Sequence, residues 1–267
     1  MQPFDTEALV VKVVAHPLPY YTIELEGPLE WAEARAGQFV MIATHPAAEP
    51  ALEPYLRRAF SIHDLSRTER GTRIELLAKV IGPGTHALSM RRRDDRLSVL
   101  GPLGRPFTLP EAGPVALVAG GVGSAPLLLL ERELAARGIE FDFFYGGRSA
   151  IDLARRDDFA ALLGPAGELV ATTEDGSAGR RGRITEPLAE RLAAGRYRAI
   201  YACGPTGLLE RLAELSAEHS VPGEAALETA MGCGFGACLG CAVPLVTGRF
   251  GLCCKDGPVF AFDAVQW

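Results

Sequence analysis

The sequence lacks several features that mark common protein classes, beginning with an excess of basic residues. Its 267 residues include 27 Lys and Arg against 33 Asp and Glu, which gives a formal net charge of −6. A protein that follows a nucleic-acid backbone usually carries a basic surplus, so this balance argues against a nucleic-acid partner. The chain has no repeat or low-complexity tract, and its five histidines show neither a metal-ligand spacing nor a triad-like arrangement with serine or cysteine.

Segments that would direct the chain to a membrane are also missing. The first residues, Met-Gln-Pro-Phe-Asp, contain neither the basic nor the apolar region of a signal peptide. One uncharged run, residues 112–130, approaches membrane-spanning length, but four glycines and two prolines interrupt it. We therefore expect a soluble, cytoplasmic protein with no membrane partner.

Length and composition indicate a globular protein of more than one domain. With 48% hydrophobic and 22% charged residues, the chain can bury a core. At roughly 150 residues per domain, a chain of 267 residues corresponds to about two domains. The residue pattern changes twice along the chain, so we expect three parts: residues 1–105, 106–222 and 223–267.

The first part has the pattern of a small antiparallel barrel. Its apolar segments are short, are rich in Val, Ile and Leu, and are separated by Gly, Pro or charged turns. Closely spaced strands without a helical period are typical of such a barrel. The expected strands are residues 8–15, 21–26, 38–44, 59–63, 72–80 and 96–100.

The second part alternates strands with helices, which predicts a parallel α/β sheet. Its first strand, residues 115–119, is continuously apolar, as expected for a strand that is buried on both faces. In such a sheet, ligands bind at the carboxyl ends of the strands. The further strands are expected at 141–145, 169–173 and 199–202, and the helices at 126–137, 153–163, 184–194 and 207–219.

The third part concentrates the cysteines. Cys203 stands alone, whereas Cys233, Cys238 and Cys241 have the spacing C-x4-C-x2-C. Cys253 and Cys254 follow Cys241 by twelve and thirteen residues. This is the plant-type [2Fe–2S] pattern. Structural zinc usually shows two C-x2-C pairs and only one is present, while unligated buried thiols are a further alternative. The spacing alone does not decide between Cys253 and Cys254 as the fourth ligand.

The glycine-rich turns of the second part indicate a dinucleotide site. Gly120, Gly121 and Gly123 follow the buried strand, and Pro126 opens the helix in place of a third glycine. This context suits a pyrophosphate at a helix N-terminus, although an ordinary tight turn would look the same. A second turn at a strand end, Cys203-Gly204-Pro205, could face the same ligand.

Three arginine- or glycine-containing segments suggest further phosphate contacts. Arg58-Ala59-Phe60-Ser61 places a cation, an aromatic ring and a hydroxyl at a strand start, and Gly84-Thr85 lies in a later turn. Without further context, residues 58–61 could be a surface arginine beside a core phenylalanine, and Gly84-Thr85 could be a simple turn. Arg148, after the second sheet strand, could contact either an adenosine ribose or a 2′-phosphate, and residues 150–153 supply no further cation. We therefore expect NAD⁺ to be preferred over NADP⁺.

In this order, the elements resemble the ferredoxin-reductase superfamily, in which a flavin-binding barrel precedes a nicotinamide-binding domain. Residues 58–61 resemble its flavin motif, Gly84-Thr85 its flavin-phosphate turn, and residues 203–205 its motif beside the nicotinamide. The cysteine segments, residues 231–241 and 254–260, are similar to those of the electron-transfer subunits of class 1B dihydroorotate dehydrogenases. One departure is that residues 206–208 replace the family's usual x-P-M after that motif.

This resemblance implies a set of cofactors and a partner. It implies FAD in the barrel, one [2Fe–2S] cluster held by Cys254 rather than Cys253, and NAD as co-substrate. Leu77, Ala78 and Lys79 fall where the family lines its flavin. The resemblance further implies a separate FMN-containing subunit that oxidises dihydroorotate for pyrimidine biosynthesis, in a heterotetramer with two copies of each chain. No side chain of this chain is then required as a catalytic acid or base.

Two alternatives remain open at this point. The chain could be the small subunit of an NADH-dependent ferredoxin:NADP oxidoreductase or of a sulfide dehydrogenase, or a zinc-stabilised binding module without catalysis. The cysteine segment has few apolar residues for a core of its own, and we expect a partner subunit to cover some of them, unless they pack on the barrel. These residues are Phe235, Leu239, Leu252, Val259 and Phe260.

Overall fold

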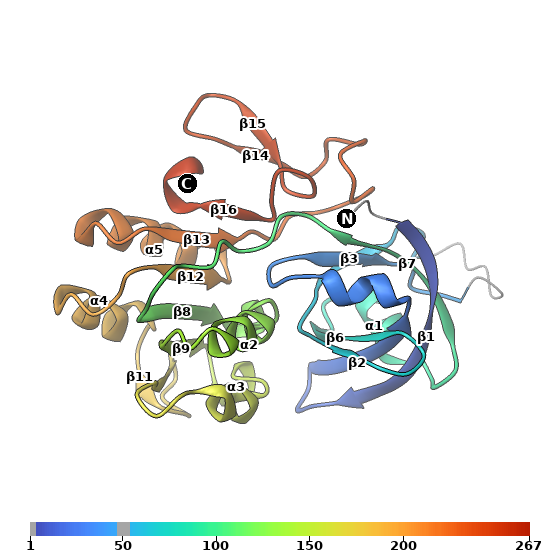
Figure 1. Ribbon diagram of the computed structural model, residues 1–267, viewed down its shortest axis with the longest axis horizontal. Helices are drawn as coiled ribbons and strands as arrows, with labels where there is room; N and C mark the ends of the chain where they lie inside the picture. Colours follow the sequence, from blue (N-terminus) through green and yellow to red (C-terminus); the bar gives the residue numbers. More distant parts are fainter. Residues whose placement is uncertain (1–3, 47–53) are drawn as a thin grey trace.

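The computed structural model describes residues 4–46 and 54–267 and contains two seven-stranded sheets and a small hairpin (Figure 1). The first sheet lies at the N-terminal end of the chain and the second follows it. Within the two described ranges, none of the helices combines the length and the apolar character that crossing a bilayer would require. The expected combination of an antiparallel barrel-type sheet with a parallel α/β domain is confirmed.

The first sheet is a half-barrel whose strands all pair antiparallel, in the order β4-β3-β7-β1-β2-β6-β5. Two of its elements were not expected from the sequence. A strand, β5, follows residue 63, and a short helix, α1 (Pro83–Ser89), stands where we expected a turn. The strands are β1 (Phe4–Ala15), β2 (Tyr20–Gly27), β3 (Phe39–Ile42), β4 (Arg58–Ser61), β5 (Asp64–Arg67), β6 (Thr72–Lys79) and β7 (Arg96–Leu103).

The second sheet has the order β11-β10-β9-β8-β12-β13-β16 and is parallel except for β16. Its central strand β8 is buried from Val115 to Ala119, because alternate residues face two separate cores. Val115 and Leu117 pack with α2 and α3, whereas Ala116 and Val118 pack with α4 and α5. The strands are β8 (Val115–Gly120), β9 (Phe141–Gly147), β10 (Leu169–Thr173), β11 (Arg180–Arg181), β12 (Ile200–Cys203), β13 (Gly223–Ala226) and β16 (Val259–Ala261). The helices are α2 (Leu127–Ala136), α3 (Arg156–Leu162), α4 (Thr185–Ala193) and α5 (Thr206–His219).

The cysteine segment lies between two strands of the second sheet. β13 and β16, which the sequence pattern did not reveal, pair antiparallel with each other, so the second sheet continues past residue 222. The hairpin of β14 (Ala242–Pro244) and β15 (Phe250–Leu252) projects beyond it at the top of Figure 1. The segment packs on Phe39, Met41 and Leu103 of the half-barrel. The chain divisions at residues 105 and 222 remain predictions.

Polar contacts join the half-barrel to the second sheet. Asp152, in the short helix Ala150–Asp152, accepts hydrogen bonds from Tyr20 Oη (2.8 Å) and Lys79 Nζ (3.2 Å). On the same side, Arg132 of α2 pairs with Asp64 at 2.8 Å. These contacts hold the end of β6 against the carboxyl ends of the second sheet.

Candidate dinucleotide cavity and cysteine centre

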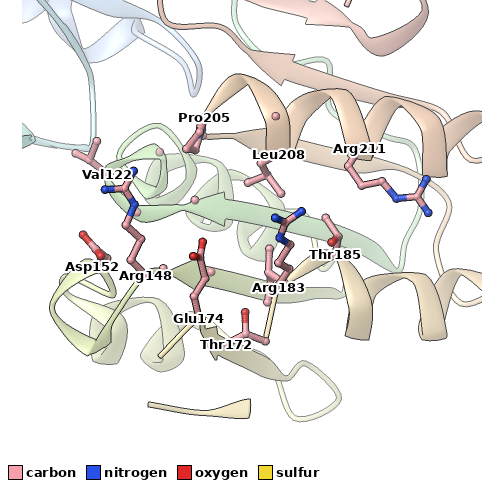
Figure 2. A pocket seen from close by; sticks show the side chains of 18 of the residues that line it. Val122, Arg148, Asp152, Thr172, Glu174, Arg183, Thr185, Pro205, Leu208 and Arg211 are labelled. Carbon is pink, nitrogen blue, oxygen red and sulfur yellow. The ribbon is translucent and has the colours of Figure 1, made fainter. Parts of the chain in front are cut away.

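A cavity of about 660 Å³ opens at the carboxyl ends of β8, β9, β10 and β12 (Figure 2). Lys79 of the half-barrel forms part of its wall, so the cavity lies where the two sheets meet. This is the edge at which a parallel sheet binds ligands. The candidate residues that line it are Lys79, Gly120, Gly121, Gly123, Arg148, Gly204 and Pro205.

The two glycine-containing turns touch each other at the cavity floor. A Cβ on Gly123 would fall against the backbone carbonyl of Cys203 and lie 2.7 Å from Gly204 Cα. A Cβ on Gly120 would lie 2.7 Å from Pro205 Cδ. Side chains at these positions would push the turns apart, which explains why glycine occupies them.

Two candidate residues of these turns lie beneath the cavity surface rather than on it. Pro126 precedes α2 at its N-cap and is buried. Cys203 is 1% exposed, and burial raises the pKa of its thiol well above the ordinary value. Cys203 is therefore a buried neutral thiol under the second turn.

Several polar residues of the cavity were not found from the sequence. Thr172 and Glu174 lie at or just beyond the end of β10, and the rule that ligands bind at the carboxyl ends of strands could have identified them. Arg183, Arg211 and Glu228 come from segments distant in the chain, and no local pattern marks them. Residues 150–153 supply no cation beside Arg148, but the fold brings Arg183 and Arg211 to the same cavity, which corrects the expectation that Arg148 has no cationic neighbour.

The candidate flavin motifs of the half-barrel come together in space. A Cβ on Gly84 would lie 2.5 Å from Arg58 Nε, so the guanidinium rests on the start of α1. The Thr85 hydroxyl is used inside this turn, where it accepts hydrogen bonds from the backbone N–H groups of Ile81 (2.9 Å) and Gly82 (3.1 Å). A guanidinium held against the first turn of α1 fits a phosphate of a flavin nucleotide.

The other candidate flavin residues differ in their exposure. Ala59 is exposed and Phe60 and Ser61 are half-buried on β4, at the edge of the half-barrel. On β6, Leu77 and Ala78 are 3% and 2% exposed, so their side chains belong to the core. Only Lys79 of this group reaches the cavity.

The four candidate cluster ligands form two pairs. Cys238 N donates to Cys233 Sγ (3.4 Å), while Cys241 Sγ and Cys254 Sγ lie 3.2 Å apart. In the described part of the chain, no three His, Cys, Asp or Glu side chains converge as the ligands of a single metal ion would. Two pairs of thiolates, one pair for each iron, are what a Cys₄-ligated [2Fe–2S] cluster requires.

The electrostatics of the two pairs also fit a bound cationic centre. Burial raises the pKa of Cys233, but the N–H groups of Cys238, Phe235 and Ala237 outweigh it and lower the pKa to about 6. Burial and the adjacent Cys241 raise the pKa of Cys254 to about 12. The second pair therefore keeps a proton unless a metal ion compensates two thiolates.

The neighbouring Cys253 points away from these pairs. Its side chain is fully buried, its Sγ donates to the carbonyl of Leu227 (3.4 Å), and burial raises its pKa to about 11. The geometry favours Cys254 as the fourth ligand, and the assignment stays a prediction.

The surface around the cysteine pairs is partly apolar. Phe235 and Leu239 are 56% and 62% exposed, as expected for residues that a partner covers. Val259 and Phe260 are buried, and Phe260 packs with Phe39 and Met41 of the half-barrel, so for these two residues the alternative of packing on the barrel applies. The further exposed apolar residues, Val246 and Phe250, flank the hairpin turn.

Two family models match the chain. Residues 228–266 match the iron–sulfur cluster binding domain of dihydroorotate dehydrogenase B. Residues 117–214 match an oxidoreductase NAD-binding domain. The first contains all four candidate ligands, and the second contains both glycine turns.

Proteins of known sequence and structure resemble nearly the whole chain. The chain is 38% identical over 270 residues to the electron-transfer subunit of dihydroorotate dehydrogenase B (NAD(+)) from Desulforamulus reducens, covering 99% of this chain and 98% of that protein. It is 34% identical to the subunit of the same name from Caldanaerobacter subterraneus, covering 90% and 91%. Among solved structures, a chain of the NADH-dependent reduced ferredoxin-NADP oxidoreductase is 30% identical with a TM-score of 0.83, covering 97% of this chain and 90% of that chain.

Proposed function

This chain belongs to the family of dihydroorotate dehydrogenase B electron-transfer subunits, and we propose that it carries electrons from a dihydroorotate-oxidising partner subunit to NAD⁺. The cofactors proposed for it are FAD on the half-barrel and one [2Fe–2S] cluster between the cysteine pairs. NAD⁺ is the co-substrate proposed for the cavity.

One observation carries this proposal: the cysteine centre begins within a few residues of the cavity wall. Glu228 lines the cavity and precedes Cys233 by five residues, so even a fully extended chain separates their Cα atoms by about 18 Å at most. Cys253, adjacent to Cys254, hydrogen-bonds the carbonyl of Leu227 beside the cavity. A short path between a metal cluster and a nicotinamide site is what an electron-transfer subunit needs.

The residues of the chain would bind and position these groups. The turns at Gly120–Gly123 and Gly204 present backbone to a dinucleotide, and Arg58 with Gly84 would hold the flavin phosphates. When bound, the flavin supplies the exchange between single-electron transfer and the two-electron chemistry of nicotinamide. The buried neutral thiol of Cys203 supports the second turn from below and takes no part as an acid or base at neutral pH.

The partner would bind at the apolar surface beside the cysteine pairs. Phe235 and Leu239 are large and exposed, and they follow Cys233 and Cys238 by two residues and one residue. We propose that the catalytic subunit, an FMN protein, covers them in a heterotetramer. All six cysteines are free, which suits the reducing cytoplasm that we propose as the compartment.

A second candidate function has a specific observation behind it. The ferredoxin-NADP oxidoreductase chain matches 97% of this chain with a TM-score of 0.83. The same cofactor arrangement could therefore serve another large subunit, because the electron donor is determined by the partner and not by this chain.

The test is reconstitution with both partners. The chain, purified anaerobically with its cofactors, is mixed with a dihydroorotate-oxidising FMN subunit from the same organism, and dihydroorotate-dependent NADH formation is measured. We expect activity only with both chains present, together with a stable complex on gel filtration. Activity only with a ferredoxin:NADP oxidoreductase subunit would select the second candidate, and a colourless protein that contains zinc would exclude both.

A further inference from the structure

The outer end of the cavity holds a carboxylate between two arginines. Arg148 follows β9, Glu174 follows β10 and Arg183 follows β11, and these three strands are neighbours at one edge of the second sheet. Backbone hydrogen bonds fix this order. Glu174 N donates to Gly147 O (3.1 Å), and Gly182 N donates to Thr173 O (3.0 Å). Figure 2 shows the Glu174 side chain between those of Arg148 and Arg183.

These three side chains make no polar contact that would stabilise the described part of the fold. Among the described residues, the side chains of Arg148, Glu174 and Arg183 form no hydrogen bond or ion pair, and all three are exposed at the cavity. Arg211, which lines the same cavity, is instead held by Glu214 (2.7 Å) and a second glutamate of α5. An acid between two unpaired bases on a cavity wall therefore suggests recognition of a ligand rather than stabilisation of the chain.

The position of this group corresponds to the adenosine end of a dinucleotide. The pyrophosphate is expected at Gly120–Gly123, and the nicotinamide on the side where Lys79 of the half-barrel and the turn at Gly204 line the cavity. The adenosine then extends over the ends of β9 and β10, toward the edge strand β11. A carboxylate at a strand end of such a fold accepts hydrogen bonds from ribose hydroxyls, whereas a 2′-phosphate is recognised by arginine.

We propose that Glu174 selects the unphosphorylated ribose of NAD(H), and that removing its charge lets Arg148 and Arg183 receive the 2′-phosphate of NADP(H). This inference rests on the proposed binding of NAD⁺ in the cavity. The cations that a 2′-phosphate needs are already present, so selectivity depends on a single repulsive group. One substitution should then reverse it, without any new arginine.

The experiment compares Glu174→Gln with Asp175→Asn in the full-length, cofactor-loaded protein. Both changes remove one negative charge from adjacent exposed residues, but Asp175 hydrogen-bonds Ser177 N (2.9 Å) and does not line the cavity. Calorimetric titration gives the affinities for 5′-AMP and for adenosine 2′,5′-diphosphate, and steady-state dye reduction gives kcat/KM for NADH and NADPH. Glu174→Ser serves as a second variant. Glu174→Gln combined with Arg183→Ala tests whether Arg183 provides any increase in affinity for the 2′-phosphate.

The expected result is a change of about tenfold or more in the ratio of the two affinities, toward the 2′-phosphate, in both Glu174 variants and not in Asp175→Asn. Adding Arg183→Ala should abolish the gain. An unchanged ratio in both Glu174 variants, or an equal change in Asp175→Asn, would overturn the role of Glu174 and leave the proposed function intact. If the unsubstituted protein binds neither NADH nor 5′-AMP, both this proposal and the proposed function are wrong.

Discussion

The cavity and the cysteine centre are built in opposite ways. The cavity floor consists of two turns whose glycines have no room for a side chain, and both turns are fixed by parallel strands of one sheet. The cysteine segment between residues 227 and 258 contains one short hairpin, and its pairs Cys233–Cys238 and Cys241–Cys254 place sulfurs close together without any covalent link.

This difference separates a preformed site from one that needs its ligand. Backbone contacts shape the cavity whether or not a dinucleotide is bound. In the cysteine centre, Cys241 Sγ and Cys254 Sγ lie 3.2 Å apart, and two thiolates at that distance would repel each other without a metal ion, so the bound cluster becomes part of the local structure. Damage to one site should therefore leave the other working, and the first two of three predictions test this independence.

The largest expected effect is that of Cys254→Ser. Without the Cys254 thiolate, Cys241 has no partner ligand, so we expect the iron content to fall from about two atoms per chain to near zero. Hydrogen exchange should rise sharply within residues 231–257 and stay unchanged in β8 and β12. NADH binding should persist, because the glycine turns do not depend on the cluster.

Cys253→Ser is the matched control for this variant. Cys253 donates to Leu227 O and points away from the pairs, and serine can keep that hydrogen bond. Iron content should remain near that of the unsubstituted protein. Equal iron loss in both variants, or loss of NADH binding along with the iron, would contradict the separation of the two sites.

Gly123→Ala should damage the cavity and spare the cluster. The new methyl group would press on the Cys203 carbonyl, which is backbone and cannot move aside cheaply, so a destabilisation of about 1–3 kcal/mol is expected. Chemical denaturation measures this cost and titration with NADH measures the weakened binding, while iron content should not change. Gly164→Ala is the control, because no atom lies within 4 Å of its added Cβ and its stability should shift by at most about 0.5 kcal/mol.

The smallest effect concerns the contact between the half-barrel and the cavity. Burial raises the pKa of Asp152, but hydrogen bonds from Tyr20 and Lys79 outweigh it and hold the pKa below the ordinary value of 3.8. A depressed pKa contributes stability above the pKa of the unfolded chain, and the contribution disappears as the pH falls through the folded pKa. Asp152→Asn should therefore cost about 1 kcal/mol near neutral pH, a modest value because the pair is partly exposed.

The pH dependence distinguishes this contact from a general charge effect. The difference in unfolding free energy between the unsubstituted protein and Asp152→Asn should be constant above about pH 5 and shrink below about pH 4. Asp158→Asn, whose carboxylate pairs with Arg155 of the same sheet domain and is half exposed, serves as the comparison. A constant difference down to pH 2 would show that the Asp152 carboxylate does not make this contribution.

The sequence reveals these two sites to different degrees, for a physical reason. Cys233, Cys238 and Cys241 follow a local spacing that cluster geometry imposes, so the pattern can be recognised within nine residues. The glycines of the cavity are likewise local signals of a tight turn. Arg183 and Glu228 reach the cavity only because the strand order β11-β10-β9-β8-β12-β13 brings distant segments to one edge.

The same distinction applies to the fold. The apolar run of β8 is unmistakable because both of its faces are buried. β5, β13 and β16 are only three or four residues long and are specified by their pairing partners, so composition does not mark them. The sequence does not mark helix α1, because its capping hydroxyl, on Thr85, lies inside the helix rather than before it.

The antiparallel pairing of β13 with β16 has a consequence for how the cysteine segment arose and can be engineered. Leu227 N donates to Pro258 O (2.9 Å), so both ends of the segment are clamped at one point of the sheet. Closing this long loop costs conformational entropy, and the pairing of β13 with β16 compensates that cost, not the cysteines. In topological terms the segment is a cassette inserted between adjacent strands, a position at which a protein can gain, lose or exchange a cofactor-binding loop while the framework on either side keeps its connectivity.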